Sequence, residues 1–145
     1  MKRTFPVFLA LLLLAGCGKA KEIDPAVLGP KLLEEAGFPD TMTELAEDML
    51  PVVWQIDVSA LESSYAAISG GATAEELLLL RAESEEDAKV LYDQLAVHLK
   101  DRTESFVAYL PEEAGKLEDA ILERYGPTVV LCVCGDPDAA RSLLE

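Results

Sequence analysis

Residues 84–111, SEEDAKVLYDQLAVHLKDRTESFVAYLP, are the most regular stretch of the chain. Apolar side chains recur every three to four residues from Ala88 to Phe106, which is the period of an α-helix with one buried face. Ser84 and the three acidic residues after it are typical of a helix start, and Pro111 interrupts the pattern. We therefore predict a long helix of about six turns between these two points.

Short β-prone segments stand on both sides of this helix: residues 63–68, 75–82, 120–125 and 128–134. Gly70-Gly71 separates the first two segments, and Gly126-Pro127 separates the last two and predicts a hairpin. Thr73-Ala74-Glu75-Glu76 also fits a capping box. A second helix start at Ser84 follows too soon, however, so we favour a strand over residues 75–82.

Short amphipathic segments precede these strands, and a last helix follows them. Asp24-Pro25 is typical of a helix start, and residues 40–51 carry a second apolar stripe with Asp40 as its cap. Asp136-Pro137 opens the terminal helix. The order ββαββα predicts an α+β fold in which an antiparallel four-stranded sheet carries the long helix and the terminal helix on one face. Both faces of residues 128–134 are apolar, so N-terminal helices or a partner should cover the other face.

The first residues have the pattern of an export signal. Lys2 and Arg3 precede an apolar run over residues 5–15 that is too short for a permanent membrane span. Leu14-Ala15-Gly16-Cys17 resembles the bacterial lipobox, in which the Cys receives a diacylglycerol before cleavage. The sequence thus predicts a signal peptide over residues 1–16, a lipidated tether over 17–24 and one α+β domain over 25–145. The alternative is a plain secretory signal in which Cys17 is only a small apolar residue.

The charge of the chain bears on its partners. With 12 basic and 27 acidic residues the formal net charge is −15, which argues against nucleic acid as a partner. Cleavage before Cys17 leaves 10 basic residues against 27 acidic ones, a side-chain charge of −17. Anionic headgroups repel such a body, so the acyl chains must hold it at the extracytoplasmic face of the cell membrane. We expect no cofactor and no metal, because the chain has a single His.

Several motifs of the predicted domain resemble those of a known family. They include residues 69–76 (SGGATAEE), residues 102–106 (RTESF) and residues 109–113 (YLPEE). Together with the closing hairpin they resemble the small lipoproteins of Gram-positive anaerobes that carry domain of unknown function 4358. The resemblance spans roughly residues 22–145. It implies an exported lipoprotein with a compact α+β domain and no assigned activity.

Two side chains on the long helix are candidates for polar roles. Arg102 falls within the apolar stripe, where a charge needs a carboxylate partner. A structural ion pair is the first interpretation, and a clamp for an anion or a carboxylate on a ligand is the second. His98 lies at the edge of the stripe, where it is a boundary residue or, in the alternative, a general base.

Glu75, Glu76, Cys132 and Cys134 are the other candidates. The two acids follow the Gly70-Gly71 turn, where they could face a ligand or a cation, although a hairpin turn explains the segment more simply. The two cysteines share one face of a strand. They are expected to be small buried hydrophobes, with a redox or metal pair as the alternative, because a relaxed disulfide across two residues of a strand is awkward.

The motifs of the common hydrolases and phosphate-binding loops are absent from the sequence. We therefore expect a non-enzymatic binding or accessory module for a protein, a peptide or a small ligand. The alternative is a small carboxylate-dependent hydrolase that uses Glu75, Glu76 and Arg102. An enzyme needs these groups to converge in a concave pocket, whereas a module needs an exposed apolar patch.

Overall fold

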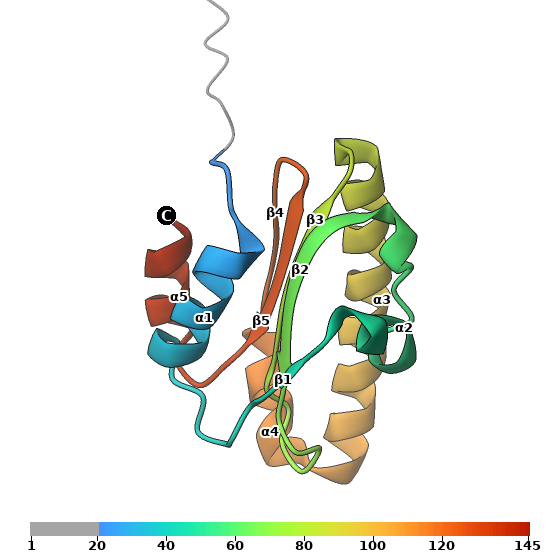
Figure 1. Ribbon diagram of the computed structural model, residues 1–145. Coiled ribbons are helices and arrows are strands. Elements are labelled where there is room, and N and C mark those ends of the chain that lie inside the picture. The colour runs from blue at the N-terminus through green and yellow to red at the C-terminus, as the bar shows by residue number, and fades with distance from the viewer. Residues whose placement is uncertain (1–20) are drawn as a thin grey trace, which may run out of the picture.

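A computed structural model describes residues 21–145 of the chain and forms one antiparallel sheet flanked by helices (Figure 1). The strand order in the sheet is β1-β2-β3-β5-β4. The strands are β1 (Thr43–Leu45), β2 (Leu61–Ile68), β3 (Glu76–Ala82), β4 (Ile121–Tyr125) and β5 (Thr128–Val133). The α-helices are α1 (Pro25–Glu35), α2 (Leu50–Val53), α3 (Glu85–Tyr109), α4 (Pro111–Glu118) and α5 (Pro137–Leu144).

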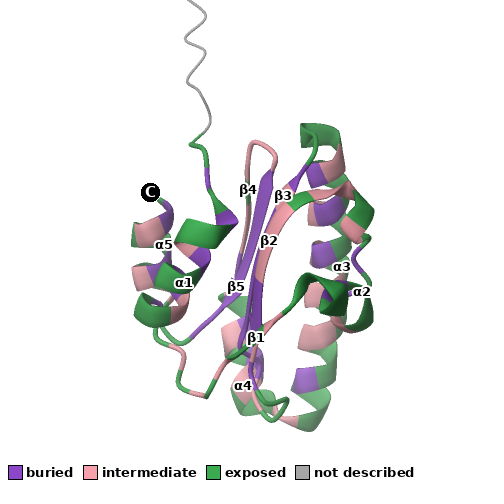
Figure 2. Cartoon of the chain, viewed as in Figure 1, coloured by how far each residue is buried: buried purple, intermediate pink, exposed green. Residues whose placement is uncertain are grey.

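The sheet is the middle of three layers. Helices α1 and α5 cover one face, and α2, α3 and α4 lie on the other (Figure 1). Strands β3 and β5 are buried on both faces, as the purple ribbons of Figure 2 show. Leu78 and Leu131 pack toward α3, and Leu77 and Val130 pack toward α1 and α5. Successive strand residues point to opposite faces, so these continuous apolar runs create two separate cores.

The long helix forms as predicted. The hydroxyl of Ser84 accepts a hydrogen bond from the backbone N–H of Asp87 and caps α3 at its start. Ala88, Leu91 and Leu95 are buried against the sheet. The helix ends before Pro111, which begins α4 as its first residue.

The predicted hairpin is confirmed as β4 and β5. Gly126 takes a φ of 57° in the turn, a value that glycine adopts without strain. Pro127 cannot adopt a positive φ, so the turn is not of type I′. Strand β5 then pairs with β3 on its other side, with Leu78 opposite Leu131. The hairpin therefore adds two strands to the sheet, with β5 inside it between β3 and the edge strand β4.

The mixed α and β class with an antiparallel sheet is confirmed, but the prediction of four strands is wrong. The fifth strand, β1, lies within residues 40–51, for which we predicted an amphipathic helix. Thr43 lies opposite Ile68 and Leu45 opposite Ala66, so three residues of this segment extend the sheet. Backbone hydrogen bonds with the end of β2 are favoured here, because the apolar pattern of this segment is too short to stabilise a helix.

The placement of both predicted helices on one face is also wrong. Leu95 of α3 belongs to the core on one side of the sheet, and Ala140 and Leu144 of α5 belong to the core on the other side. The reason is the double apolar character of β3 and β5, since each face needs its own helical cover. Helix α1 shares the second face with α5 (Figure 1). The N-terminal cover expected for that face is therefore present.

The predicted tether and signal fall mostly outside the described residues. Residues 1–16 and Cys17 lie there, and residues 21–24 lead into α1. The side chain of Thr128 donates a hydrogen bond of 3.1 Å to the carbonyl of Ile23, which fixes the start of the domain beside β5. Within residues 21–145, no helix combines the length and the apolar character needed to cross a membrane.

Candidate functional site

A buried carboxylate stands at the centre of the candidate site. Glu76, the first residue of β3, is fully buried on the face that α3 covers. The indole N–H of Trp54 donates to its Oε2 at 2.8 Å, and Nε2 of His98 lies 3.0 Å from both carboxylate oxygens. Nε of Arg102 lies 3.6 Å from Oε1. We call these four residues the Glu76 cluster.

Three elements bring the cluster together. His98 and Arg102 are four residues apart on α3, so they share the helix face that looks toward the start of β3. Trp54 is the C-cap residue that follows α2, and the next residue, Gln55, takes a φ of 58°. A positive φ is uncommon outside glycine. The chain therefore changes direction at Gln55, directly after Trp54, whose indole contacts Glu76.

His98 uses only one of its two ring nitrogens within the cluster. A carboxylate is a hydrogen-bond acceptor, so the hydrogen-bond network assigns the proton to Nε2. Nδ1 has no hydrogen-bond partner among the described residues. The ring therefore presents a free nitrogen beside a groove, with its orientation fixed from behind by Glu76.

Arg102 is held by long contacts. One terminal nitrogen lies 3.4 Å from the carbonyl of Thr73 and 3.5 Å from that of Ala74. Its Nε is buried and makes no hydrogen bond. The guanidinium carbon lies 5.1 Å from the centroid of the Phe106 ring, within the range of a cation–π contact. Several contacts thus position the guanidinium, but its N–H donors form only long hydrogen bonds or none.

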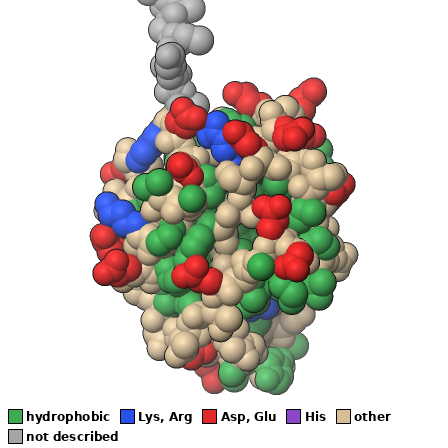
Figure 3. All heavy atoms as spheres, viewed as in Figure 1, with side chains coloured by type: hydrophobic (Ala, Val, Ile, Leu, Met, Phe, Trp, Pro, Cys, Tyr) green, Lys and Arg blue, Asp and Glu red, His purple; other side chains and the backbone are tan. Residues whose placement is uncertain are grey.

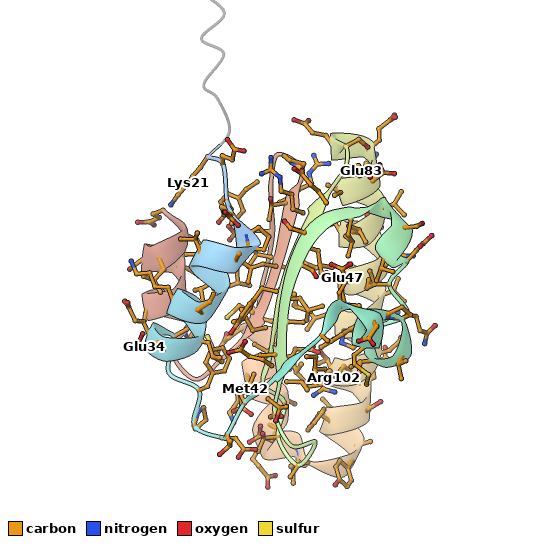
Figure 4. All side chains as sticks on the ribbon, viewed as in Figure 1. Lys21, Glu34, Met42, Glu47, Glu83 and Arg102 are labelled. Carbon is orange, nitrogen blue, oxygen red and sulfur yellow. The ribbon has the colours of Figure 1, made fainter. Side chains whose placement is uncertain are left out.

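The Glu76 cluster lies at a groove of about 590 Å³. Figure 4 labels Arg102 between α3 and the sheet, and in Figure 3 the same region shows basic atoms recessed among hydrophobic ones. Trp54, His98 and Arg102 line the groove together with residues outside the cluster: Val53, Gln55, Gln94, Val97, Asp101, Ser105 and Phe106. The lining combines apolar walls with amide, hydroxyl and charged groups.

A second ion cluster holds the neighbouring acid. Glu75 is fully buried, and its Oε1 lies 2.6 Å from Nζ of Lys116 on α4. Lys116 also contacts Glu113 at 2.8 Å, and Glu113 accepts a hydrogen bond from the backbone N–H of Ala74 at 2.9 Å. This second cluster, which we call the Glu75 cluster, ties α4 to the chain just before β3.

The groups of the Glu75 cluster shift each other's titration. Burial alone would lower the pKa of Lys116, but the hydrogen bonds to Glu113 and Glu75 outweigh it, and the pKa is raised. Burial would raise the pKa of Glu113, whereas the hydrogen bonds from Lys116 and Ala74 lower it, with a net lowering. Both shifts favour the charged forms, so this cluster is a set of structural ion pairs.

The structure separates the predicted site residues. Arg102 meets Glu76, which agrees with the ion pair that its position in the apolar stripe predicted. Glu75 faces Lys116 instead. Adjacent residues of an extended chain point in opposite directions, so Glu75 and Glu76 serve different clusters. The three groups of the proposed carboxylate hydrolase do not meet at one point.

Cys132 and Cys134 lie on the opposite face, in the core beneath α1 and α5, and both are free. A hydrogen bond from its thiol to Cys134, together with burial, raises the pKa of Cys132. A buried thiol with a raised pKa is unreactive. Among the described residues, no group of three or more His, Cys, Asp and Glu side chains is arranged to hold a metal ion.

The sequence interpretation missed three partners of the buried acids. No pattern in the sequence singles out Trp54 or Lys116, and the apolar stripe predicts His98 as a boundary residue or a general base. A signal was present for one of them: His98 and Arg102 are spaced by four residues beside an apolar stripe, which places an imidazole and a guanidinium on one helix face. The partners of Trp54 and Lys116 depend on contacts between distant segments, and no local pattern encodes them.

The fold and the groove define a class of protein: a small three-layer α+β domain with a polar groove beside its long helix. The family Domain of unknown function (DUF4358) matches residues 34–134, so the chain belongs to this family, as the motifs predicted. The matched span contains both ion clusters. No curated protein and no solved structure matches the chain.

Proposed function

We propose that the chain is a lipid-anchored lipoprotein of the extracytoplasmic face whose domain is a binding module, with its ligand in the groove beside the Glu76 cluster. One observation carries the binding role: a fully buried carboxylate is surrounded by His98, Arg102 and Trp54 at the edge of an open groove. Buried ionic groups contribute little net stability. Their concentration at a concave surface favours a binding function.

The groove, and not an uncovered face of the sheet, supports the binding role. An apolar sheet face without a cover would have required one, but α1 and α5 cover that face. On the α3 side of the sheet, Val97 is an exposed apolar residue, with 60% of its surface accessible. Val97 lines the groove. The binding proposal therefore rests on the α3 side of the molecule.

The binding role can be tested with the intrinsic fluorescence of Trp54, which is the single tryptophan of the chain and lines the groove. We expect a subset of a mixed library of polar fragments to change its emission. Val97→Tyr should fill the groove and abolish that response. Val90→Tyr is the matched control, because Val90 lies one heptad earlier on α3, is 57% exposed and does not line the groove. An equal response from both variants would reject the groove as the binding site.

The anchor is tested separately. Cells grown with labelled palmitate should incorporate the label into the wild-type protein, and Cys17→Ala should lose both the label and the membrane fraction. Cys132→Ala is the control because it removes a buried thiol of the domain and leaves Cys17 in place. Retention of label in Cys17→Ala would reject lipidation at this residue.

A second candidate function is a small hydrolase, and the His98–Glu76 pair favours it. Glu76 orients the imidazole through Nε2, which leaves Nδ1 free to accept a proton from a water molecule. Arg102 stands nearby to stabilise a developing negative charge. If this function holds, a panel of ester and amide substrates should show turnover that falls at least about 100-fold in His98→Gln. Absence of turnover by the wild-type chain would remove this candidate.

A further inference from the structure

We infer that the ligand of the groove is a monocarboxylate with an apolar body, and that Arg102 binds the carboxylate. This inference rests on the binding function proposed above and names the chemical class of its ligand. It depends on how the charges around Glu76 are partnered and on what lines the rest of the groove.

Glu76 does not need Arg102 as a hydrogen-bond donor. Its two oxygens already accept hydrogen bonds from the indole N–H of Trp54 at 2.8 Å and from Nε2 of His98 at 3.0 Å. Nε of Arg102 approaches only to 3.6 Å and makes no hydrogen bond. The carboxylate of Glu76 offsets the positive charge of the guanidinium, but it accepts no hydrogen bond from Arg102.

The remaining hydrogen bonds of Arg102 are long and come from Nη2, and Nη1 has no hydrogen-bond partner among the described residues. The terminal nitrogen sits at 3.4 and 3.5 Å from two backbone carbonyls, and the planar group lies beside the ring of Phe106. A guanidinium that is oriented in advance and poorly satisfied binds a carboxylate through two parallel N–H···O bonds. No other residue that lines the groove carries a guanidinium or an ammonium group.

The rest of the lining selects the body of the ligand and its charge. Val53, Val97 and Phe106 provide apolar walls, and a volume of about 590 Å³ suits a small molecule or a few residues of peptide. Asp101 also lines the groove. Its carboxylate and the net charge of −15 oppose a ligand with two negative charges. A single carboxylate satisfies Arg102 without adding to this repulsion.

Two sources can supply this chemistry: the C-terminus of a short peptide, and a free aliphatic acid. The experiment titrates the full chain with N-acetyl-leucine, N-acetyl-leucinamide and hexanoate, with Trp54 emission as the readout. We expect at least one acid to bind at least tenfold more tightly than the amide. Tighter binding of N-acetyl-leucine indicates a peptide terminus, and tighter binding of hexanoate indicates an aliphatic acid.

Arg102→Lys tests the residue, because lysine keeps the positive charge and loses the planar fork. We expect it to weaken binding of the acid at least tenfold and to leave any binding of the amide unchanged. Arg124→Lys is the matched control, since Arg124 is an exposed guanidinium on β4, away from the groove. The comparison of the acids with the amide is made on the wild-type chain, so that test of the ligand class remains valid even if Arg102→Lys does not fold.

The inference is overturned if the amide binds as tightly as both acids, or if a folded Arg102→Lys keeps the affinity of the wild type. In either case, a fragment response that Val97→Tyr abolishes would leave the binding function intact. If neither acids nor neutral fragments bind, the ligand class and the binding function both fail.

Discussion

At the scale of single residues, the adjacent acids Glu75 and Glu76 have different surroundings and therefore different effects on stability and binding. Glu76 borders an open groove, whereas Glu75 is enclosed between β3 and α4 with Lys116 as its cation. One oxygen of Glu75 has no hydrogen-bond partner. The Glu75 carboxylate therefore depends on Lys116 for compensation of its charge, and stability should be most sensitive there.

Lys116→Met should lower the free energy of unfolding by about 3–5 kcal/mol, because it leaves a buried carboxylate without its cation. Adding Glu75→Gln to the same chain should restore part of this loss, since the uncompensated charge is then removed. Urea denaturation of the three proteins measures both effects. Lys100→Met is the control: Lys100 and its partner Glu104 are exposed and 3.9 Å apart, so little change is expected. A Lys116→Met protein as stable as the control would show that Glu75 is solvated.

The pH dependence of stability follows from Glu113 and Lys116. The pKa of Glu113 is lowered from its ordinary value of 4.5, so its stabilising contribution is present above that pH and is lost as the pH falls through the folded value. The pKa of Lys116 is raised from 10.5, so its contribution is complete below that pH and is lost as the pH rises through the folded value. This cluster is therefore most stabilising between roughly pH 5 and 10.

Glu113→Gln isolates the acidic side of that range. The variant should be less stable than the wild type at pH 7, and its Tm should fall less steeply between pH 5 and 3 because the titrating group has been removed. Thermal unfolding followed by circular dichroism at several pH values measures the two slopes. Parallel slopes would assign the acid sensitivity to other carboxylates.

At the scale of elements, the long helix and the hairpin could be predicted because their signals are local. Ser84 and Pro111 bracket an apolar stripe, and Gly126-Pro127 separates two β-prone runs. Strand β1 could not be predicted, because three residues acquire strand geometry only when β2 lies beside them. The side of the sheet that α5 covers is equally non-local. The apolar pattern of β5 indicates that both faces of the sheet must be covered, but it does not encode which helix packs on which face.

The packing of α1 on the sheet gives a prediction at the same scale. A Cβ atom added at Gly29 would overlap the ring of Tyr65 on β2, so helix and strand meet without room for a methyl group. Gly29→Ala should lower the free energy of unfolding by about 1–3 kcal/mol, as overpacked cores do. Gly115→Ala on α4 is the matched control. Nothing lies within 4 Å of a Cβ at that position, and a gain of about 0.5–1 kcal/mol is expected there from helix propensity.

The same limits apply to the candidate site. Arg102 was identifiable because a charge within an apolar stripe needs a carboxylate, and Glu76 is that carboxylate. The groove was not identifiable, since Trp54 comes from a segment more than 40 residues earlier in the chain than His98 and Arg102. The turn at Gln55, with its positive φ, has no signature in the residue type. The chemistry of one side chain could be inferred, and its surroundings required the fold.

At the scale of the whole molecule, the described chain begins at the end of the domain opposite α4 (Figures 1 and 4). If Cys17 carries the lipid, three residues stand between the anchor and Lys21. The bilayer would then face the Lys21 end of the domain. Strand β2 and helix α3 begin near that side, and β3 ends there (Figure 4). Glu62, Glu83 and Glu85 at these points would add no attraction to anionic headgroups.

The domain itself should therefore show no affinity for a membrane. A Cys17→Ala chain that begins at residue 17 carries a side-chain charge of −17, and vesicles with anionic lipids repel it at low ionic strength, where screening is weak. In a flotation assay we expect this protein to stay in the dense fraction with neutral and anionic vesicles alike. The lipidated wild type should float with both, because about 0.8 kcal/mol per buried CH₂ of two acyl chains exceeds the electrostatic penalty. Flotation of the unlipidated protein would show that a surface of the domain, rather than the anchor, provides the attachment.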